Sequence, residues 1–281
     1  MEVTLWGTRG SLATPGPETA LYGGNTSCVG VRGRDGTVLV LDAGTGIRRF
    51  AKTIPASVLR VDILLTHLHM DHILGLGFFG PLYREDVDVH IWGPASSTQN
   101  LQARLKRYLS PPLFPVRLSE LPCKLHFHEV PCRDVDIGEF RISTALVCHP
   151  GPTVGYRIES SSGRVLTYLP DHEPALGALR FPALPREWTS GAILAAEADL
   201  LIHDSQYSTA EYGFCCGWGH SSLNHTLDFG TLAGVKRLVP FHHDPNHTDA
   251  DLDGLMLQAL EQAKPEYQVT PGKEGTVFQL Y

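Results

Sequence analysis

The sequence predicts an α/β fold in which two β-sheets pack face to face and helices cover their outer surfaces. Short runs rich in Val, Ile, Leu and aromatic residues recur along the chain and alternate with amphipathic segments. Hydrophobic residues make up 42% of the 281 residues and charged residues 19%, a balance that can fill a large core. The 28 glycines and 20 prolines supply turns between many short elements. Because strands outnumber helices, a sheet-on-sheet core covered by helices is the expected packing.

The predicted strands are apolar runs bounded by Gly, Pro or Asp. In chain order they are Val3–Gly7, Thr26–Val31, Thr37–Asp42, Val61–Thr66, Val87–Trp92, Leu125–Val130, Phe140–Val147, Val154–Glu159, Arg164–Leu169, Leu200–His203, Arg237–Phe241 and Thr276–Leu280. The predicted helices are Gly46–Thr53, His72–Phe79, Ser97–Leu109, Ser221–Leu232 and Asp249–Ala263. Leucines at helical spacing follow a cap at Thr248 or Asp249 in the last helix. With no internal repeat and no long linker, we expect a single domain over residues 1–281.

The charge balance is acidic, with 23 basic and 30 acidic residues and a net charge of −7. Extended binding to nucleic acid draws on clustered Lys and Arg, so we do not expect it here. No apolar run approaches the ~18 residues of a membrane helix. The N-terminal residues lack a basic start and an apolar stretch, so we expect a cytoplasmic protein. The six cysteines form no CxxC pair and are expected to be reduced, although Cys123 and Cys132 could pair in an oxidising compartment.

One cluster of polar residues directly follows a predicted strand. The apolar run Val61–Leu65 leads into His67, His69, Asp71 and His72, so that four potential ligands fall within six residues. Alternate residues of an extended segment point the same way, and Asp71 and His72 can turn toward the same point as a helix begins. So many polar groups beside buried strands would cost several kcal/mol without partners, and a metal ion provides them.

This HxHxDH motif resembles that of the metallo-β-lactamase superfamily, and later residues follow the same pattern. His149 follows one strand, Asp171 the next pair of strands, and His242 a late strand. The resemblance covers most of the chain and implies an αββα sandwich of four layers, with two mixed sheets flanked by helices. It also implies two divalent metal ions, one bound by His67, His69 and His149 and the other by Asp71, His72 and His242, with Asp171 between them. We expect zinc, with manganese or iron as alternatives.

Two further motifs resemble those of tRNase Z-type phosphodiesterases. Leu201–Ser205 ends a strand in His203 and Asp204, where that family has Glu, and Gly219–Ser222 places His220 before a helix. The resemblance implies that His220 acts near the leaving group and that Asp204 supports it, although the shorter Asp side chain puts their contact in doubt. We predict His220, Asp204 and Asp71 as the residues that take part in the chemistry.

The remaining histidines have simpler interpretations. His243 competes with His242 as a ligand, but adjacent residues of a strand face opposite ways, and the family motif favours His242. We expect His172 at the surface. The same solvated setting is expected for His90, His126, His128, His225 and His247.

Glycine-rich turns at Gly7–Ser11, Tyr22–Ser27 and Asp42–Gly46 could bring the backbone close to a ligand or could be simple corners. In the first of these turns, Arg9 could hold a phosphate or a base. The insert Gln99–Lys124 carries five cations and four prolines, and it could be a lid, a dimer contact or an RNA-binding insert.

Together these motifs predict a dinuclear metal-dependent phosphodiesterase. In it, a hydroxide shared by the two metals attacks phosphorus and His220 acts as the general acid. A small anionic substrate, in particular a 3′,5′-cyclic nucleotide, is the first expectation, because the chain is acidic and lacks the basic arm of tRNase Z. The alternatives are a tRNA 3′-processing endoribonuclease, a glyoxalase II-like thiolesterase or lactonase, and a nucleotide-binding sensor without activity. The superfamily resemblance also suggests a homodimer.

Overall fold

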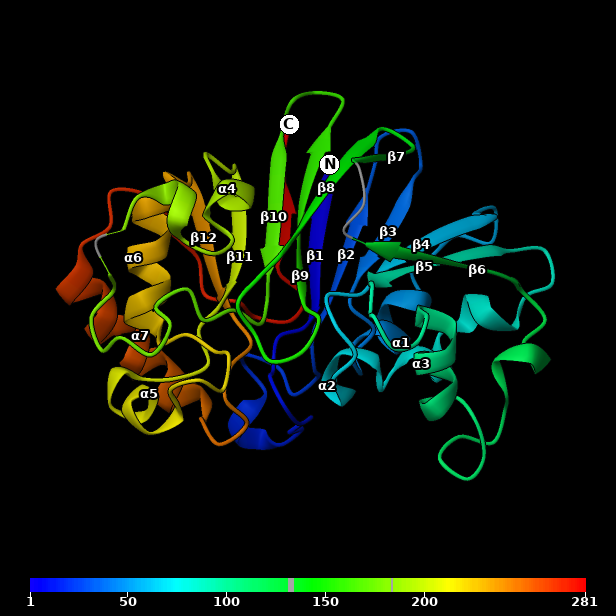
Figure 1. Cartoon of the computed structure of the whole chain (residues 1–281), viewed down its shortest axis with the longest axis horizontal. Helices are drawn as coiled ribbons and strands as arrows, with labels where there is room; N and C mark the ends of the chain where they lie inside the picture. Colours follow the sequence, from blue (N-terminus) through cyan, green and yellow to red (C-terminus); the bar gives the residue numbers. More distant parts are fainter. Residues whose placement is uncertain (131–133, 183) are drawn as a thin grey trace.

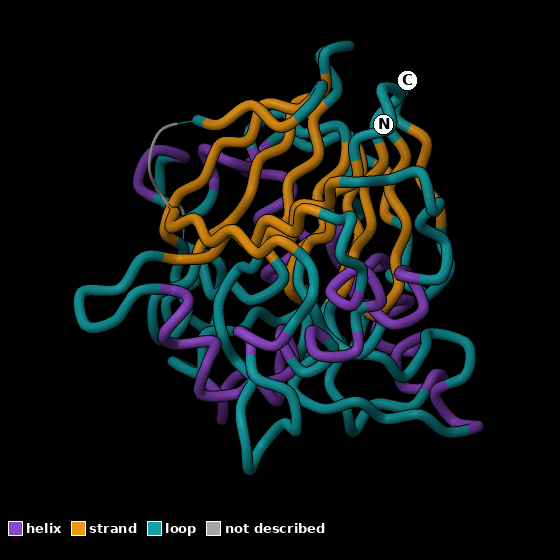
Figure 2. Tube along the Cα trace, turned by 90° about the vertical axis from the view of Figure 1, so that its right-hand side faces the viewer, coloured by secondary structure: helices purple, strands orange, loops and turns teal. Residues whose placement is uncertain are grey.

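The computed structural model describes residues 1–130, 134–182 and 184–281. Within this part of the chain two seven-stranded sheets lie face to face, and helices cover the outer side of each (Figure 1). Figure 2 shows the strands gathered toward one end of the molecule and the helices and long loops at the other. The predicted αββα sandwich is therefore confirmed.

The first sheet runs in the order β14-β1-β2-β3-β4-β5-β6. Its strands are β1 (Glu2–Gly7), β2 (Cys28–Arg32), β3 (Val38–Leu41), β4 (Arg60–Leu64), β5 (Asp88–Pro94), β6 (Lys124–Val130) and β14 (Val277–Gln279). The strands from β14 to β3 pair antiparallel, and those from β3 to β6 pair parallel. The sheet is therefore mixed.

The second sheet runs in the order β13-β12-β11-β10-β9-β8-β7. Its strands are β7 (Val135–Ile137), β8 (Phe140–Leu146), β9 (Val154–Ser160), β10 (Val165–Leu169), β11 (Leu200–Asp204), β12 (Arg237–Phe241) and β13 (Gln268–Val269). The run β10-β11-β12-β13 is parallel, whereas β7 to β10 pair antiparallel. The carboxyl ends of β10, β11 and β12 therefore meet at one edge.

Helices α1 to α3 lie on the side of the first sheet and α4 to α7 on the side of the second (Figure 1). They are α1 (Ile47–Ala51), α2 (Met70–Ile73), α3 (Leu101–Tyr108), α4 (Ala192–Ala195), α5 (Thr209–Cys215), α6 (Leu223–Ala233) and α7 (Asp249–Ala263). Short 3-10 turns occur at Pro17–Thr19, Leu76–Phe78, Gly80–Tyr83, Leu118–Glu120 and Arg186–Trp188. None of the helices in the described ranges has both the length and the apolar character that a membrane crossing requires.

The predicted helix His72–Phe79 is divided in the structure. It begins earlier, at Met70, ends at Ile73, and is followed by the 3-10 turn Leu76–Phe78. The N–H of Gly75 donates to the carbonyl oxygen of Ala43 at 2.9 Å and not to the preceding turn, and a Cβ atom at Gly75 would lie 2.1 Å from the carbonyl oxygen of Gly44. This contact packs the segment that carries the HxHxDH motif against the loop after β3.

Three apolar clusters define the layers. In β3, Leu39 and Leu41 point into the core between the sheets, whereas Val38 and Val40 point out toward α1. This alternation is the period of two expected for a strand covered on both faces. A third cluster fills the space between the second sheet and α4, α6 and α7. The buried polar side chains His67, Asp171 and His242 accordingly lie just beyond the carboxyl ends of β4, β10 and β12.

Candidate metal centre

The HxHxDH segment lies at the carboxyl end of β4, as the sequence predicts. The chain passes from β4 through His67 and then turns at His69, which has the extended conformation of an N-cap before α2. Asp71 and His72 therefore sit in the first turn of α2 and are buried, as is His67. The strand and the short helix together aim these side chains toward the second sheet.

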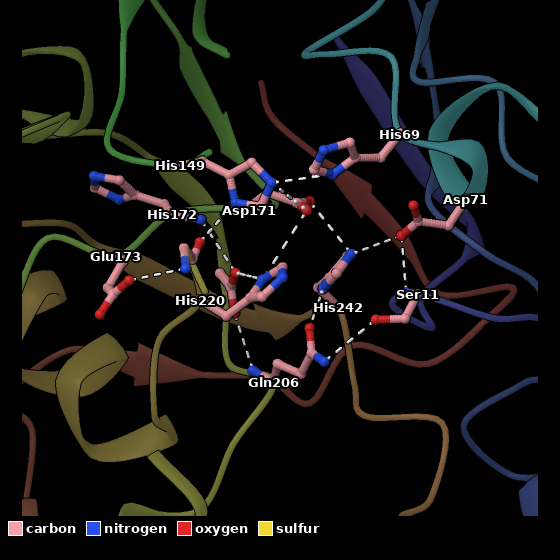
Figure 3. A network of polar contacts seen from close by, with 12 residues as sticks. Ser11, His69, Asp71, His149, Asp171, His172, Glu173, Gln206, His220 and His242 are labelled. Atoms are coloured by element: carbon pink, nitrogen blue, oxygen red, sulfur yellow. Dashed lines mark hydrogen bonds and ion pairs between the residues drawn. The ribbon is translucent and has the colours of Figure 1, made fainter. Parts of the chain in front are cut away.

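The second sheet supplies the other three predicted ligands. His149 follows β8, Asp171 follows β10 and His242 follows β12. All three are buried. Figure 3 shows the side chains of His69, His149, Asp171 and His242 turned toward one another. The structure therefore brings all seven predicted ligands to one place between the sheets.

The seven side chains form two groups that share Asp171. One group contains His67, His69, His149 and Asp171, and the other Asp71, His72, His242 and Asp171. In the first group the His69 Nδ1 and His149 Nε2 atoms lie 3.2 Å apart, and in the second the Nε2 atoms of His72 and His242 lie 3.3 Å apart. Two nitrogens bound to one tetrahedral zinc at 2.0–2.1 Å lie about 3.4 Å from each other. One pair of nitrogens in each group therefore has the spacing of two ligands on a tetrahedral ion.

Asp171 presents one carboxylate oxygen to each group. Its Oδ1 atom lies 2.9 Å from His72 Nε2 and 3.3 Å from His242 Nε2. Its Oδ2 atom lies 3.6 Å from His67 Nε2 and 3.7 Å from His149 Nε2. With one oxygen toward each group, Asp171 could bind a cation in both of them.

The protonation states favour metal binding. Burial and the neighbouring His72 lower the pKa of His67 well below its usual value, so the ring is neutral and keeps a lone pair. Burial would raise the pKa of Asp171, but His242, His72 and His67 hold it well below its usual range. The buried Nε2 atom of His67 has no hydrogen-bond partner in the described part of the chain. Burial lowers the pKa of His72, but Asp171, Asp71 and Asp42 raise it well above its usual value, so a cation bound there would replace a proton. The neutral imidazole of His67 with its unpaired nitrogen, together with the ionised carboxylate of Asp171, fits a dinuclear site for divalent cations.

Contacts outside the two groups orient the imidazoles. The ring nitrogen that faces away from the centre has a partner in four cases: Thr66 Oγ1 for His67, Asp42 for His72, the carbonyl oxygen of Gly219 for His149 and Gln206 for His242. Such partners fix the tautomer and the angle of a ligating imidazole. The sequence reasoning missed Asp42 and Gln206 in this role, although Asp42 begins one of the glycine-rich turns.

The N-terminal turn packs directly against the centre. A Cβ atom at Gly10 would lie 2.3 Å from Nδ1 of His242, so only glycine allows this approach. The backbone N–H of Ser11 donates to the Asp71 carboxylate at 2.8 Å. The expectation that Arg9 holds a phosphate or a base is wrong, because its guanidinium is fully buried and donates to the carbonyl oxygens of Gly23, Asp244 and His247.

His220 lies beside the two groups and contacts Asp204. Its Nδ1 atom is 2.7 Å from the Asp204 carboxylate, so the shorter Asp side chain does reach it. Burial lowers the pKa of His220, but the Asp204 charge and hydrogen bond outweigh this and raise it to about 9. The His220 ring lies 5.0 Å from those of both His149 and His242. The Asp204 carboxylate thus favours the protonated form of an imidazole at the side of the centre.

Glu173, which sequence reasoning also missed, holds the segment that carries His220. Its carboxylate accepts hydrogen bonds from the backbone N–H groups of Gly217 and Gly219 at 2.9 and 2.8 Å, and from the hydroxyl of Tyr212 at 2.9 Å. Figure 3 shows Glu173 next to His172 and His220. The position of Glu173, two residues after Asp171, is the only sequence signal for this role.

Several other histidines differ from expectation. His172 is fully buried and not at the surface, because its Nδ1 atom pairs with His203 Nε2 at 2.9 Å. His225 and His247 are buried as well. His243 points away from the centre to the carbonyl oxygen of Gly272 at 2.9 Å, and burial lowers its pKa to about 3. Only His242 of the adjacent pair belongs to the seven-residue cluster.

Known proteins resemble this chain along almost its whole length. The sequence model of the beta-lactamase superfamily domain matches residues 37–243. Ribonuclease Z of Thermoplasma acidophilum is 26% identical over 96% of this chain and 93% of its own length. The metallo-beta-lactamase fold protein YhfI from Bacillus subtilis superposes with a TM-score of 0.70 at 18% identity, covering 99% of this chain and 98% of that one. The short form of human tRNase Z superposes with a TM-score of 0.69 at 22% identity over the full length of both chains.

These relatives correct the expectation about partners. The acidic balance predicted a small substrate and no extended nucleic-acid binding, yet the relatives that match across the chain are named as ribonucleases. The expectation is wrong because net charge sums over the whole surface and says little about one groove.

The matched domain covers the segment from β3 to the end of β12, which contains every predicted ligand. This match and the His and Asp cluster confirm the predicted class of metal-dependent hydrolase. The chain belongs to the beta-lactamase superfamily.

Proposed function

We propose that this chain is a ribonuclease Z-like phosphodiesterase that cleaves a tRNA precursor at its 3′ end. The observation that carries the proposal is the placement of the His220–Asp204 pair beside the two metal-binding groups. A phosphodiester has a poor leaving group and gains from a proton donor, whereas a thiolester or lactone needs less help. Similarity to ribonuclease Z over nearly the whole of both chains supports RNA as the substrate.

The seven-residue cluster and the His220–Asp204 pair have different roles in the proposed hydrolysis. Two divalent ions bound by the seven-residue cluster would supply Lewis acidity and a water of lowered pKa. His220 holds a proton on its imidazole and donates it to the leaving oxygen as the phosphorus–oxygen bond breaks. Asp204 keeps this imidazole charged and oriented. The elements of one water molecule are thereby added across the bond, giving a phosphomonoester and an alcohol.

The 3′,5′-cyclic nucleotide expected from the sequence has less support than RNA. None of the relatives described above is named for it, so we keep cyclic nucleotides as a comparison in the test. The glyoxalase II-like alternative uses the same metal ligands but gives His220 and Asp204 no part in the chemistry. A nucleotide-binding sensor without activity would lack a metal ligand, His220 or Asp204. The structure brings all of these residues together.

The test compares four substrates with the metal-loaded protein: a tRNA precursor with a 3′ trailer, a set of 3′,5′-cyclic nucleotides, bis(p-nitrophenyl) phosphate and an acyl-glutathione. We expect cleavage of the precursor at the 3′ end of the mature tRNA. In His220→Ala, turnover should fall about 10²–10⁴-fold while the bound metal, measured by elemental analysis, is unchanged. Hydrolysis of the acyl-glutathione alone, or full activity of His220→Ala on RNA, would refute the proposal.

A further inference from the structure

A recess that is lined in part by His220 lies beside the metal centre. It has a cavity volume of about 430 Å³ and is lined by residues that include Gln206, Tyr207, Glu211, Trp218, His220 and Asp244. This volume lies within the range of about 300–1,000 Å³ that is common for small-molecule sites. The seven predicted ligands are not among its lining residues, but Gln206, which contacts His242, is, so the recess adjoins the metal-binding groups.

We propose that this recess binds the nucleobase of the nucleoside that carries the leaving oxygen, with the base stacked on Trp218. The inference rests on the proposed function, because a leaving nucleoside exists only if the substrate is an RNA. It adds a specificity-determining residue to a site whose chemistry is otherwise assigned to metal ligands, His220 and Asp204.

The position of His220 links the recess to the reaction. This imidazole lines the recess and also lies 5.0 Å, ring to ring, from His149 and His242 in the two metal-binding groups. A leaving oxygen that receives a proton from His220 must lie next to this ring. The nucleoside attached to that oxygen then extends away from the metals, and the recess is the space on that side.

The side chain of Trp218 is exposed, and hydrogen bonds hold the backbone on both sides of it. Its side chain is 61% exposed, whereas Tyr207, which also lines the recess, is buried and packs edge-on against the His220 ring at 5.9 Å. The backbone on both sides of Trp218 is fixed, because Gly217 and Gly219 donate to Glu173. An aromatic ring exposed on a rigid loop can stack on a base without losing much entropy, and such stacking contributes about 1–3 kcal/mol per base.

The charges of the recess favour a base over a phosphate. Its lining contains the carboxylates of Asp244 and Glu211, and among the described residues its one basic side chain is the imidazole of His220, with no Lys or Arg. A phosphate group would be repelled by these carboxylates, whereas a neutral base with amino groups would not. The proposal therefore places the phosphates of the RNA at the metal-binding groups and one base in the recess.

The test uses two tRNA precursors that differ at one position. The nucleoside with the leaving oxygen, identified from the ends of the products, carries either its natural base or no base. For the wild-type protein we expect kcat/KM to be roughly 5- to 150-fold higher with the base present. Trp218→Ala should lose this preference and cleave the abasic RNA as well as the wild type does, and Trp218→Phe should keep most of it.

Phe214→Ala serves as the matched control, since Phe214 is an aromatic residue of the neighbouring helix α5 that is 89% exposed and does not line the recess. It should leave the preference unchanged. Equal cleavage of both RNAs by the wild type, or a preference that survives in Trp218→Ala, would overturn the base site while the proposed function stands. Cleavage of neither RNA would overturn both.

Discussion

The side-chain carbonyl oxygen of Gln206 lies 3.0 Å from Nδ1 of His242, and this contact decides which nitrogen faces the metal centre. A carbonyl oxygen only accepts hydrogen bonds, so Nδ1 carries the proton and Nε2 keeps its lone pair. The amide nitrogen of Gln206 donates to Ser11 Oγ at 3.3 Å and to Asp244 at 3.2 Å, which holds the amide in this orientation.

Replacing Gln206 should weaken the metal-binding group that contains His242. In Gln206→Ala the imidazole can rotate or change tautomer, and loss of such a partner usually costs about 10–100-fold in metal affinity. Titration of the metal-free protein with zinc, followed by calorimetry, measures this change. Gln258→Ala, which removes an exposed glutamine of α7, is the control. Equal zinc affinity in the two variants would mean that the orientation of the His242 imidazole does not depend on Gln206.

Asp204 and His220 should act as one unit. Asp204→Asn removes the charge that keeps the His220 ring protonated, so RNA cleavage should fall by at least tenfold with metal content unchanged. Because Asp204 acts through His220, the double variant Asp204→Asn/His220→Ala should be about as slow as His220→Ala alone. Single-turnover cleavage rates of the four proteins give this comparison. If the two losses multiplied instead, Asp204 would have a separate role.

Glu173→Gln should loosen the segment that bears His220 and Trp218. A glutamine has one acceptor oxygen, so one of the N–H groups of Gly217 and Gly219 would lose its partner, at a cost of about 1–3 kcal/mol. Hydrogen exchange over residues 217–220 should become faster and kcat should fall. The exposed Glu187→Gln is the matched change. Unchanged exchange in Glu173→Gln would show that the segment is held by other contacts.

The contacts of Asp199, just before β11, with β10 and neighbouring cations should make the stability of the fold depend on pH. Its carboxylate accepts from the backbone N–H of Val165 at 2.8 Å and contacts Lys236 at 2.8 Å and Arg164 at 3.1 Å. Burial would raise its pKa, but these donors lower it. The stabilisation is therefore present above the unfolded-state pKa of about 3.9 and is lost as the pH falls through the lower folded-state value.

We expect Asp199→Asn to lower the free energy of unfolding by about 1–3 kcal/mol at pH 7. The difference from the wild type should shrink on acidification below pH ~4. Urea unfolding at a series of pH values measures both. The exposed Asp136→Asn is the control and should differ little from the wild type at pH 7. A difference that stayed constant down to pH 3 would contradict the assigned role.

The strands that could be predicted from the sequence are longer and have a stronger apolar pattern than those that could not. The longer apolar strands were predictable, whereas β7 with three residues and β13 with two carry no periodic signal. Helix α5 was missed because Gly213 interrupts it, although the capping box of Ser208 and Glu211 marks its start.

The same limit applies to the site. The predicted ligands follow strands and could be read from the sequence, but supporting residues depend on distant contacts. Glu173 meets Gly219 across 46 residues, and the partner of His172 lies 31 residues away. No local pattern encodes such pairs, and for this reason His172 was wrongly placed at the surface.

The ligand set is divided between the two sheets, and this division bears on how the protein folds. Four of the seven side chains follow β4 in the first sheet, and three follow strands of the second. Neither half alone can complete either cation-binding group, because Asp171 from the second sheet belongs to both. Complete coordination of either cation therefore requires that the halves have docked, so a chelator present during refolding should leave early collapse unaffected and lower the stability of the final state.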